Sequence, residues 1–128
     1  MNIDLKIGKD VLLVEDDRET LEAMSTLLQY YGYSLATAEN GQQALDYLRA
    51  CQALPQVILL DMTMPVMDGR EFLTIQCRDQ ELRAVPVVTI SAIHNCYGLI
   101  EEYGVAHCLN KPVDLARLFE LLARYCDA

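Results

Sequence analysis

The sequence predicts an α/β fold in which a parallel five-stranded sheet carries helices on both faces. Apolar runs of strand length, among them residues 11–14 and 57–60, alternate along the chain with segments of helical period. Neighbouring parallel strands need a crossover connection, and a helix supplies it. The length of 128 residues suits a single core, so residues 1–128 are expected to form one domain.

The first half of the chain is expected to hold three strands and two helices. In order, they are strand 10–14, helix 18–31, strand 33–38, a helix that opens at Asn40, and a strand that ends at Leu60. Gly32 ends the first helix, because glycine readily adopts the conformation of a C-terminal cap. The residues expected to face the core are Leu21, Met24, Leu28 and Tyr31 in the first helix, and Ala44, Leu45 and Leu48 in the second.

The second half of the chain continues the alternation. Its expected elements are helix 70–79, strand 85–90, a short helix 96–103, strand 105–109 and a last helix 113–126. Pro86 is compatible with a strand because it comes near the strand start. The inward residues are expected to be Phe72, Leu73 and Ile75 in the first of these helices, and Leu115, Leu118, Phe119, Leu122 and Tyr125 in the last.

The composition excludes several classes of function. A formal net charge of -9 argues against direct binding to a nucleic-acid backbone, which needs clustered Lys and Arg. The apolar runs are too short for membrane insertion. Residues 1–10 lack the basic stretch and apolar core of a secretion signal, so a cytoplasmic location is expected.

The cysteine pattern fits reduced thiols in the cytosol. There are five cysteines, an odd number, and no CxxC pair. A zinc site is disfavoured because neither of two close His and Cys pairs has the usual spacing between ligands. Those pairs are His94 with Cys96 and His107 with Cys108. We interpret these residues as core and loop filling.

Acidic, hydroxyl and basic side chains stand where the expected strands end. Glu15 and Asp16 follow the first strand, Asp61 follows the third, Ser91 the fourth and Lys111 the fifth. In open parallel sheets, ligands bind outside the carboxyl ends of the strands. Three carboxylates there repel one another. The repulsion energy of each pair is about 4 kcal/mol at a separation of about 4 Å and an effective dielectric constant of about 20. Such a cluster therefore indicates a hard cation, and oxygen ligands favour Mg²⁺.

Each of these residues also has a purely structural interpretation. Asp17 is better explained as a helix N-cap than as a metal ligand, since it directly precedes the first helical turn. Glu15 alone would be a solvated loop acid, Lys111 alone a surface lysine, and Ser91 alone a turn cap. Asp68 with Gly69 forms a turn dipeptide. The functional interpretation rests on four strand ends carrying suitable groups at once.

Four motifs make the chain resemble a known family. They are VLLVEDD, VILLDMTMPVMDG, VVTISA and LNKPV, in this order. The chain is similar over nearly its whole length to the receiver domain of two-component response regulators, and in particular to the single-domain, chemotaxis-type members. The resemblance implies a flavodoxin-like (βα)5 sheet of strand order 2-1-3-4-5.

The resemblance also implies a role for each site residue. Asp61 would accept a phosphoryl group from a sensor histidine kinase or a histidine phosphotransfer protein. Mg²⁺ would be bound by Asp61, by Asp16, by the backbone carbonyl of Thr63, and through water by Glu15. Ser91 and Lys111 would each bind a phosphoryl oxygen, and a cis peptide would precede Pro112. The chain would thus be no enzyme, but an acceptor that at most phosphorylates and dephosphorylates itself.

Two departures from the family pattern concern the output of the signal. Many receivers carry an aromatic residue three positions before the lysine, where this chain has Cys108. The segment between Ser91 and Gly104 is shorter than usual, which predicts a short or irregular fourth helix. The resemblance implies that a downstream protein is contacted through the face formed by residues 92–126.

Other readings of the sequence remain as alternatives. The chain could be a receiver fragment of a hybrid kinase or a larger regulator, although Met1 and the lack of a linker favour a stand-alone protein. A phosphotransferase of the haloacid dehalogenase type also places an Asp nucleophile after a strand, but it usually carries a second Asp where this chain has Thr63. A flavin carrier is disfavoured, because the acidic first loop would repel the flavin phosphate.

Overall fold

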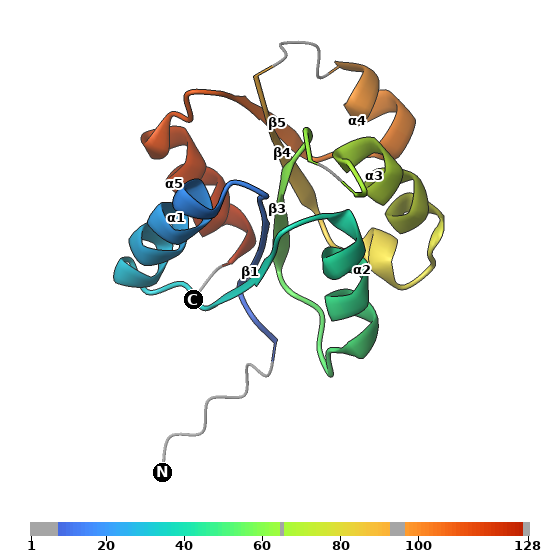
Figure 1. The fold of residues 1–128 in the computed structure, drawn as a ribbon, viewed down its shortest axis with the longest axis horizontal. Helices are drawn as coiled ribbons and strands as arrows, with labels where there is room; N and C mark the ends of the chain where they lie inside the picture. The colour runs from blue at the N-terminus through green and yellow to red at the C-terminus, as the bar shows by residue number, and fades with distance from the viewer. Residues whose placement is uncertain (1–7, 65, 93–96, 127–128) are drawn as a thin grey trace.

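A single parallel sheet of five strands forms the centre of the molecule (Figure 1). The computed structural model describes residues 8–64, 66–92 and 97–126. The strand order is β2-β1-β3-β4-β5, and every neighbouring pair is parallel. The predicted fold class and strand order are therefore confirmed.

Strands and helices alternate along the chain as expected, with one addition. In order, the elements are β1 (Val11–Val14), α1 (Arg18–Tyr30), β2 (Leu35–Ala38), α2 (Gly41–Ala50), β3 (Val57–Asp61), α3 (Gly69–Arg78), the 3-10 helix η1 (Leu82–Ala84), β4 (Val87–Ser91), α4 (Tyr97–Tyr103), β5 (His107–Asn110) and α5 (Leu115–Tyr125). The described part of α4 has seven residues, and the expected shortness of the fourth helix stays a prediction because residues 93–96 lie outside the described part of the chain. No helix among the described residues is both long and apolar enough to cross a membrane.

The sheet separates two apolar cores, because successive side chains of a strand point to opposite faces. Helices α1 and α5 cover one face, and α2, α3 and α4 cover the other (Figure 1). In β1, Val11 and Leu13 pack on the first face, while Leu12 and Val14 pack on the second. All four residues are buried. A strand buried on both faces reads as a continuous apolar run, which explains the sequence pattern.

Four helices begin at a side chain that accepts a hydrogen bond from the backbone N–H three residues later. These N-cap residues are Asp17, Asn40, Asp68 and Asp114, at the starts of α1, α2, α3 and α5. Such a cap pairs one of the backbone donors that a helix start leaves without a partner. Asp17 is thus confirmed as a cap, and Asp68 acts as a cap rather than only as part of a turn.

Two residues expected in the core are exposed instead. Tyr31 is 60% exposed, because α1 ends at Tyr30 and Tyr31 is already the C-cap residue. Its ring lies across the outer side of Phe119, with 4.7 Å between the ring centroids. Leu115 is 45% exposed because it is the first residue of α5, and the buried side of that helix follows at Leu118, Leu121 and Leu122.

Some element bounds differ from the expected ones by one or two residues. Strands β2, β4 and β5 each begin two residues later than predicted and end at residues 38, 91 and 110. The described part of α4 begins at Tyr97, and the earlier residues of the expected helix lie outside the described part of the chain. His94 and Cys96 of the disfavoured zinc site also lie outside it.

The connection between α3 and β4 contains the 3-10 helix η1. The buried side-chain amide of Gln76 in α3 donates to the backbone carbonyls of Leu82 at 2.8 Å and Val85 at 3.2 Å. The Leu82 carbonyl also accepts the Val85 N–H at 3.1 Å, so the Gln76 amide adds a second donor there. A polar residue on the inner side of α3 therefore fixes the turn into β4.

Helix α5 provides a matched test of this core. We expect Leu118→Ala to lower the free energy of unfolding by about 2–5 kcal/mol, because the side chain is fully buried and its loss leaves a cavity. Leu115→Ala, in the same helix but half exposed, should change it by less than about 1 kcal/mol. Urea unfolding followed by circular dichroism measures both values. Equal losses in the two variants would contradict the assigned orientation of α5.

Candidate functional site

The parallel sheet brings the expected site residues to one edge. Asp61 is the last residue of β3 and Ser91 is the last residue of β4. Glu15 and Asp16 follow β1, and Lys111 follows β5. The register pairs Val14 with Leu60, Asp61 with Ile90 and Ser91 with Asn110, so the four strands end at nearly the same level.

Three carboxylates form a compact cluster at this edge. One carboxylate oxygen from each of Glu15, Asp16 and Asp61 lies within 4.8 Å of the others. Asp61 is 3% exposed and Glu15 is 5% exposed, whereas Asp16 is exposed. Two acids are therefore held out of water, and the third faces the solvent from which a cation would arrive.

Lys111 supplies the positive charge opposite the cluster. Its Nζ lies 3.6 Å from Asp61 Oδ1 and 3.8 Å from Glu15 Oε1. The Lys111 backbone N–H donates to the carbonyl of Ser91 at 2.9 Å. The peptide bond between Lys111 and Pro112 is cis, as the resemblance implied. The lysine thus bridges both buried acids, and its backbone ties the end of β5 to the end of β4.

Backbone donors orient the two buried carboxylates. The Thr63 N–H donates to Asp61 Oδ1 at 3.1 Å, and the Asp17 N–H donates to Glu15 Oε2 at 3.2 Å. Each acid therefore has one oxygen held by the following loop. The expected contribution of the Thr63 carbonyl to a metal stays a prediction.

The loop from β3 to α3 is packed closely against the site. Gly69 lies against Met62, and a Cβ atom at Gly69 would come within 2.7 Å of the Met62 Cα. The Gly69 N–H also donates to the Met62 carbonyl at 3.3 Å. Val66 has a φ of 67°, a region that branched side chains rarely occupy. The described ends of this loop are therefore packed against each other at Met62 and Gly69, and Val66 has a strained backbone conformation.

The environment of the cluster raises the pKa of Glu15. The pKa of Glu15 is raised from 4.5 to about 7, mainly by burial and also by the hydrogen bond and the charge of the neighbouring Asp61 carboxylate. The Asp17 N–H and the charge of Lys111 act in the opposite direction. A lysine alone therefore does not neutralise the cluster, and the close-set oxygen ligands fit a hard divalent cation such as Mg²⁺.

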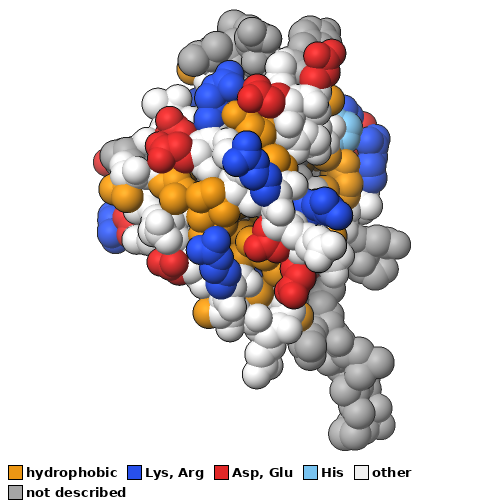
Figure 2. All heavy atoms as spheres, turned by 90° about the vertical axis from the view of Figure 1, so that its right-hand side faces the viewer, with side chains coloured by type: hydrophobic (Ala, Val, Ile, Leu, Met, Phe, Trp, Pro, Cys, Tyr) orange, Lys and Arg blue, Asp and Glu red, His pale blue; other side chains and the backbone are white. Residues whose placement is uncertain are grey.

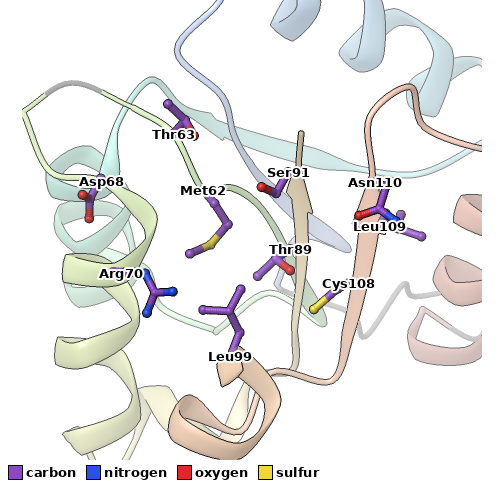
Figure 3. A pocket seen from close by; sticks show the side chains of 10 residues that line it. All are labelled: Met62, Thr63, Asp68, Arg70, Thr89, Ser91, Leu99, Cys108, Leu109 and Asn110. Carbon is purple, nitrogen blue, oxygen red and sulfur yellow. The ribbon is translucent and has the colours of Figure 1, made fainter. Parts of the chain in front are cut away.

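Two cavities flank the end of β4. One, of about 220 Å³, lies on the α1 and α5 side and is lined by Glu15, Asp61 and Lys111 together with Met24 and Ile90. The other, of about 150 Å³, lies on the α3 and α4 side (Figure 3). Ser91 lines the second cavity, so the structure places it beside the acid cluster rather than within it.

Sequence reasoning overlooked Thr89 and Cys108 as cavity residues. They face each other across the β4–β5 ladder, two pairs before Ser91 and Asn110, and all four line the second cavity. The period of two along a strand could have indicated that Thr89 points to the same side as Ser91. The cavity itself depends on packing between α3 and α4, which that period does not reveal.

The sheet order, the acid cluster and the lysine at the strand ends define a receiver domain of two-component signalling. The chain belongs to the response regulator receiver domain family, whose profile matches residues 11–123. Receiver domains of this family are signalling domains rather than metabolic enzymes.

Among curated proteins, the chain is similar to the polar-differentiation response regulator DivK of Brucella anthropi. The two are 29% identical over 119 residues, which cover 91% of this chain and 95% of DivK. A stand-alone regulator of similar length therefore aligns with nearly all of this chain.

Two solved structures have a similar fold. The receiver domain of a sensor histidine kinase from Pseudomonas aeruginosa, with a magnesium ion coordinated in its active-site cleft, has a TM-score of 0.80 and 25% identity. That match covers 94% of this chain and 99% of the other. The phosphorylated cyanobacterial phytochrome response regulator RcpA has a TM-score of 0.76 and 27% identity, over 94% of this chain and 95% of the other.

The raised pKa of Glu15 makes the stability of the metal-free protein depend on pH. Because the folded state favours protonated Glu15, folding takes up a proton between about pH 4.5 and pH 7. We therefore expect the free energy of unfolding in EDTA to fall, by about 2–3 kcal/mol, as pH rises through this range. Glu15→Gln should remove this contribution, as denaturant unfolding at several pH values would measure.

The matched control is Glu19→Gln, which removes an exposed acid from the first turn of α1. It should leave the pH dependence of the wild-type protein intact. A Glu15→Gln variant that loses stability over the same range as the wild type would contradict the assignment of this effect to Glu15.

Proposed function

We propose that the chain is a stand-alone receiver that accepts a phosphoryl group on Asp61 and signals through protein contacts. The observation that carries the proposal is the geometry around Asp61. This buried carboxylate lies within 4.8 Å of two further acids, and Lys111 Nζ lies 3.6 Å from its Oδ1. The family membership and the similarity to a phosphorylated regulator support the same function.

The transfer step uses the Asp61 carboxylate as the nucleophile. A carboxylate oxygen attacks the phosphorus of a phosphohistidine, the new O–P bond forms, and the P–N bond breaks. The electron pair of that bond goes to the imidazole of the donor, which leaves after taking up a proton. Because such a transfer requires mainly positioning and charge balance, the fixed orientation of Asp61 by the Thr63 N–H is a direct contribution.

The residues that would hold Mg²⁺ are Asp16 and Asp61 directly, the backbone carbonyl of Thr63, and Glu15 through water. When bound, the cation offsets the negative charge of the acids and of the phosphoryl oxygens. The similar receiver domain from a sensor histidine kinase, described with magnesium in its cleft, supports this assignment.

Ser91 and Lys111 are proposed to respond to the phosphoryl group. Lys111 would exchange its contact with Asp61 for one with a phosphoryl oxygen, and the Ser91 hydroxyl would donate to another. The Lys111 N–H to Ser91 carbonyl bond joins the two strand ends, so they would move together. The change would reach a downstream protein through the face formed by residues 92–126.

The proposed partners are a sensor histidine kinase or a histidine phosphotransfer protein, in the cytoplasm. The side of the molecule seen in Figure 2 mixes Lys and Arg with Asp and Glu around hydrophobic side chains. Such a surface suits protein contacts, and it lacks the basic patch that nucleic-acid binding requires. A receiver unit within a hybrid kinase is the second candidate, favoured by the similarity to a kinase receiver domain.

Phosphorylation can be tested with acetyl phosphate or a phosphoramidate and Mg²⁺. We expect intact mass spectrometry to show one added phosphoryl group, which is lost in Asp61→Asn and in EDTA. The matched control is Asp17→Asn. This variant keeps an effective N-cap beside the cluster and should still be labelled.

An unchanged mass, under conditions that label another receiver, would contradict the proposal. Continuous hydrolysis of small phosphate esters would instead favour a phosphotransferase of the haloacid dehalogenase type. A receiver labels itself once and shows no such turnover.

Metal binding provides a separate test of the acid cluster. We expect Asp16→Asn to weaken Mg²⁺ binding by about tenfold or more, because it removes a charged oxygen ligand. Isothermal titration calorimetry measures this affinity without phosphorylation. Asp17→Asn serves again as the control and should change the affinity by less than about threefold. The Asp17 carboxylate caps α1 by accepting a hydrogen bond from the Thr20 N–H and is not proposed as a metal ligand. Equal affinities for the wild type and Asp16→Asn would contradict the ligand assignment.

A further inference from the structure

The cavity on the α3 and α4 side forms a small chamber beside the phosphorylation site. It has a volume of about 150 Å³ and is lined from four directions, by Met62 after β3, Arg70 of α3, Leu99 of α4 and Cys108 of β5. These side chains surround one space in Figure 3. Leu99 is 4% exposed, whereas Thr63, Arg70 and Asn110 are exposed, so the chamber has an apolar floor and opens to solvent.

A hydroxyl group in the wall of this chamber has no partner among the residues that the structure describes. Thr89 is fully buried, and its Oγ1 makes no hydrogen bond there. A buried hydroxyl without a partner costs free energy, because the loss of its hydrogen bonds to water is not offset. Thr89 lines the chamber, so a molecule inside it can supply the missing hydrogen bond.

The residues that line the chamber indicate which class of small molecule could bind in it. A cavity of about 150 Å³ is large enough for benzene. Its walls are partly apolar, at Met62, Leu99 and Cys108, and partly polar, at Asp68, Thr89 and Asn110 among others. Met62 contributes a thioether, and sulfur contacts favour an aromatic ring over an aliphatic group. Arg70 contributes a guanidinium, which stacks favourably on an aromatic face. Its pairing with Glu102 is loose, at 3.9 Å between two exposed side chains, so Arg70 can turn toward a ligand.

We propose that this chamber is a binding site for a single aromatic ring that carries one hydroxyl group, a phenol. The ring would lie between Met62, Leu99 and Arg70, and its hydroxyl would pair with Thr89 Oγ1. Thr89 and Cys108 have no part in the proposed phosphoryl transfer, so the site is distinct from the acid cluster. Its place beneath Ser91 would put the ligand against the end of β4.

The site can be tested by titrating the full chain with phenol and, separately, with benzene, followed by amide chemical shifts in NMR spectra. We expect saturable shifts for residues around the chamber, among them Thr89, Leu99 and Cys108. Thr89→Val should weaken phenol binding by about three- to tenfold, the usual effect of one lost hydrogen bond. The same variant should leave benzene binding within about twofold, because it keeps the shape of the wall.

The matched control is Thr37→Val, an exposed threonine on β2, far from the chamber in the sheet order. It should leave the affinity for phenol unchanged. Cys108→Phe would fill the chamber and should abolish the shifts from both ligands. Circular dichroism checks that this variant is folded, and Cys108→Leu replaces it if it is not.

Several outcomes would overturn the proposal. Phenol that causes no saturable shift up to its solubility would mean that the chamber holds water only. Shifts that persist unchanged in both Cys108→Phe and Thr89→Val would place the ligand elsewhere. Loss of phosphorylation at Asp61 has no bearing on these results, because the readout is ligand binding in the absence of a phosphodonor.

Discussion

The repulsion among Glu15, Asp16 and Asp61 is the interaction on which the arrangement of this edge depends. The parallel sheet brings their oxygens within 4.8 Å of one another, and two of the three acids are buried. Burial makes the charged form of Glu15 unfavourable, which is why its pKa rises to about 7. Lys111 and the backbone donors of Asp17 and Thr63 offset part of this energy. The remainder favours any positive charge that can enter from the exposed side, where Asp16 lies.

The end of β4 separates two environments. On one side, Lys111 and the buried acids line a cavity together with apolar residues, and on the other side Thr89 and Cys108 line the chamber. Ser91 belongs to the chamber wall, while its carbonyl accepts the hydrogen bond of the Lys111 N–H. The end of β4 therefore contacts both sides, because its backbone is hydrogen-bonded to Lys111 and the Ser91 side chain lines the chamber. The small Cys108 side chain leaves space on that face.

The fold and the cluster followed from the sequence because both depend on local periodicity. Strands buried on both faces appear as apolar runs, and parallel pairing then brings Asp61 and Lys111 to one edge. Tyr31 and Leu115 were misplaced because the helix period does not show where a helix begins or ends. Gln76 and Thr89 were overlooked for another reason. Their surroundings are built by residues distant in the chain, so their hydrogen bonding can be judged only in three dimensions.

The capped helix starts affect the electrostatic potential at the site. Helices α1, α3 and α5 follow strands whose carboxyl ends form the edge, so these helices also begin there. Each helix start carries a partial positive charge from its aligned peptide dipoles. At these three starts the Asp caps, Asp17, Asp68 and Asp114, offset part of that positive charge. The backbone N–H groups of the first turns are fixed in position, so an approaching dianion meets these donors at the same edge as the acidic side chains.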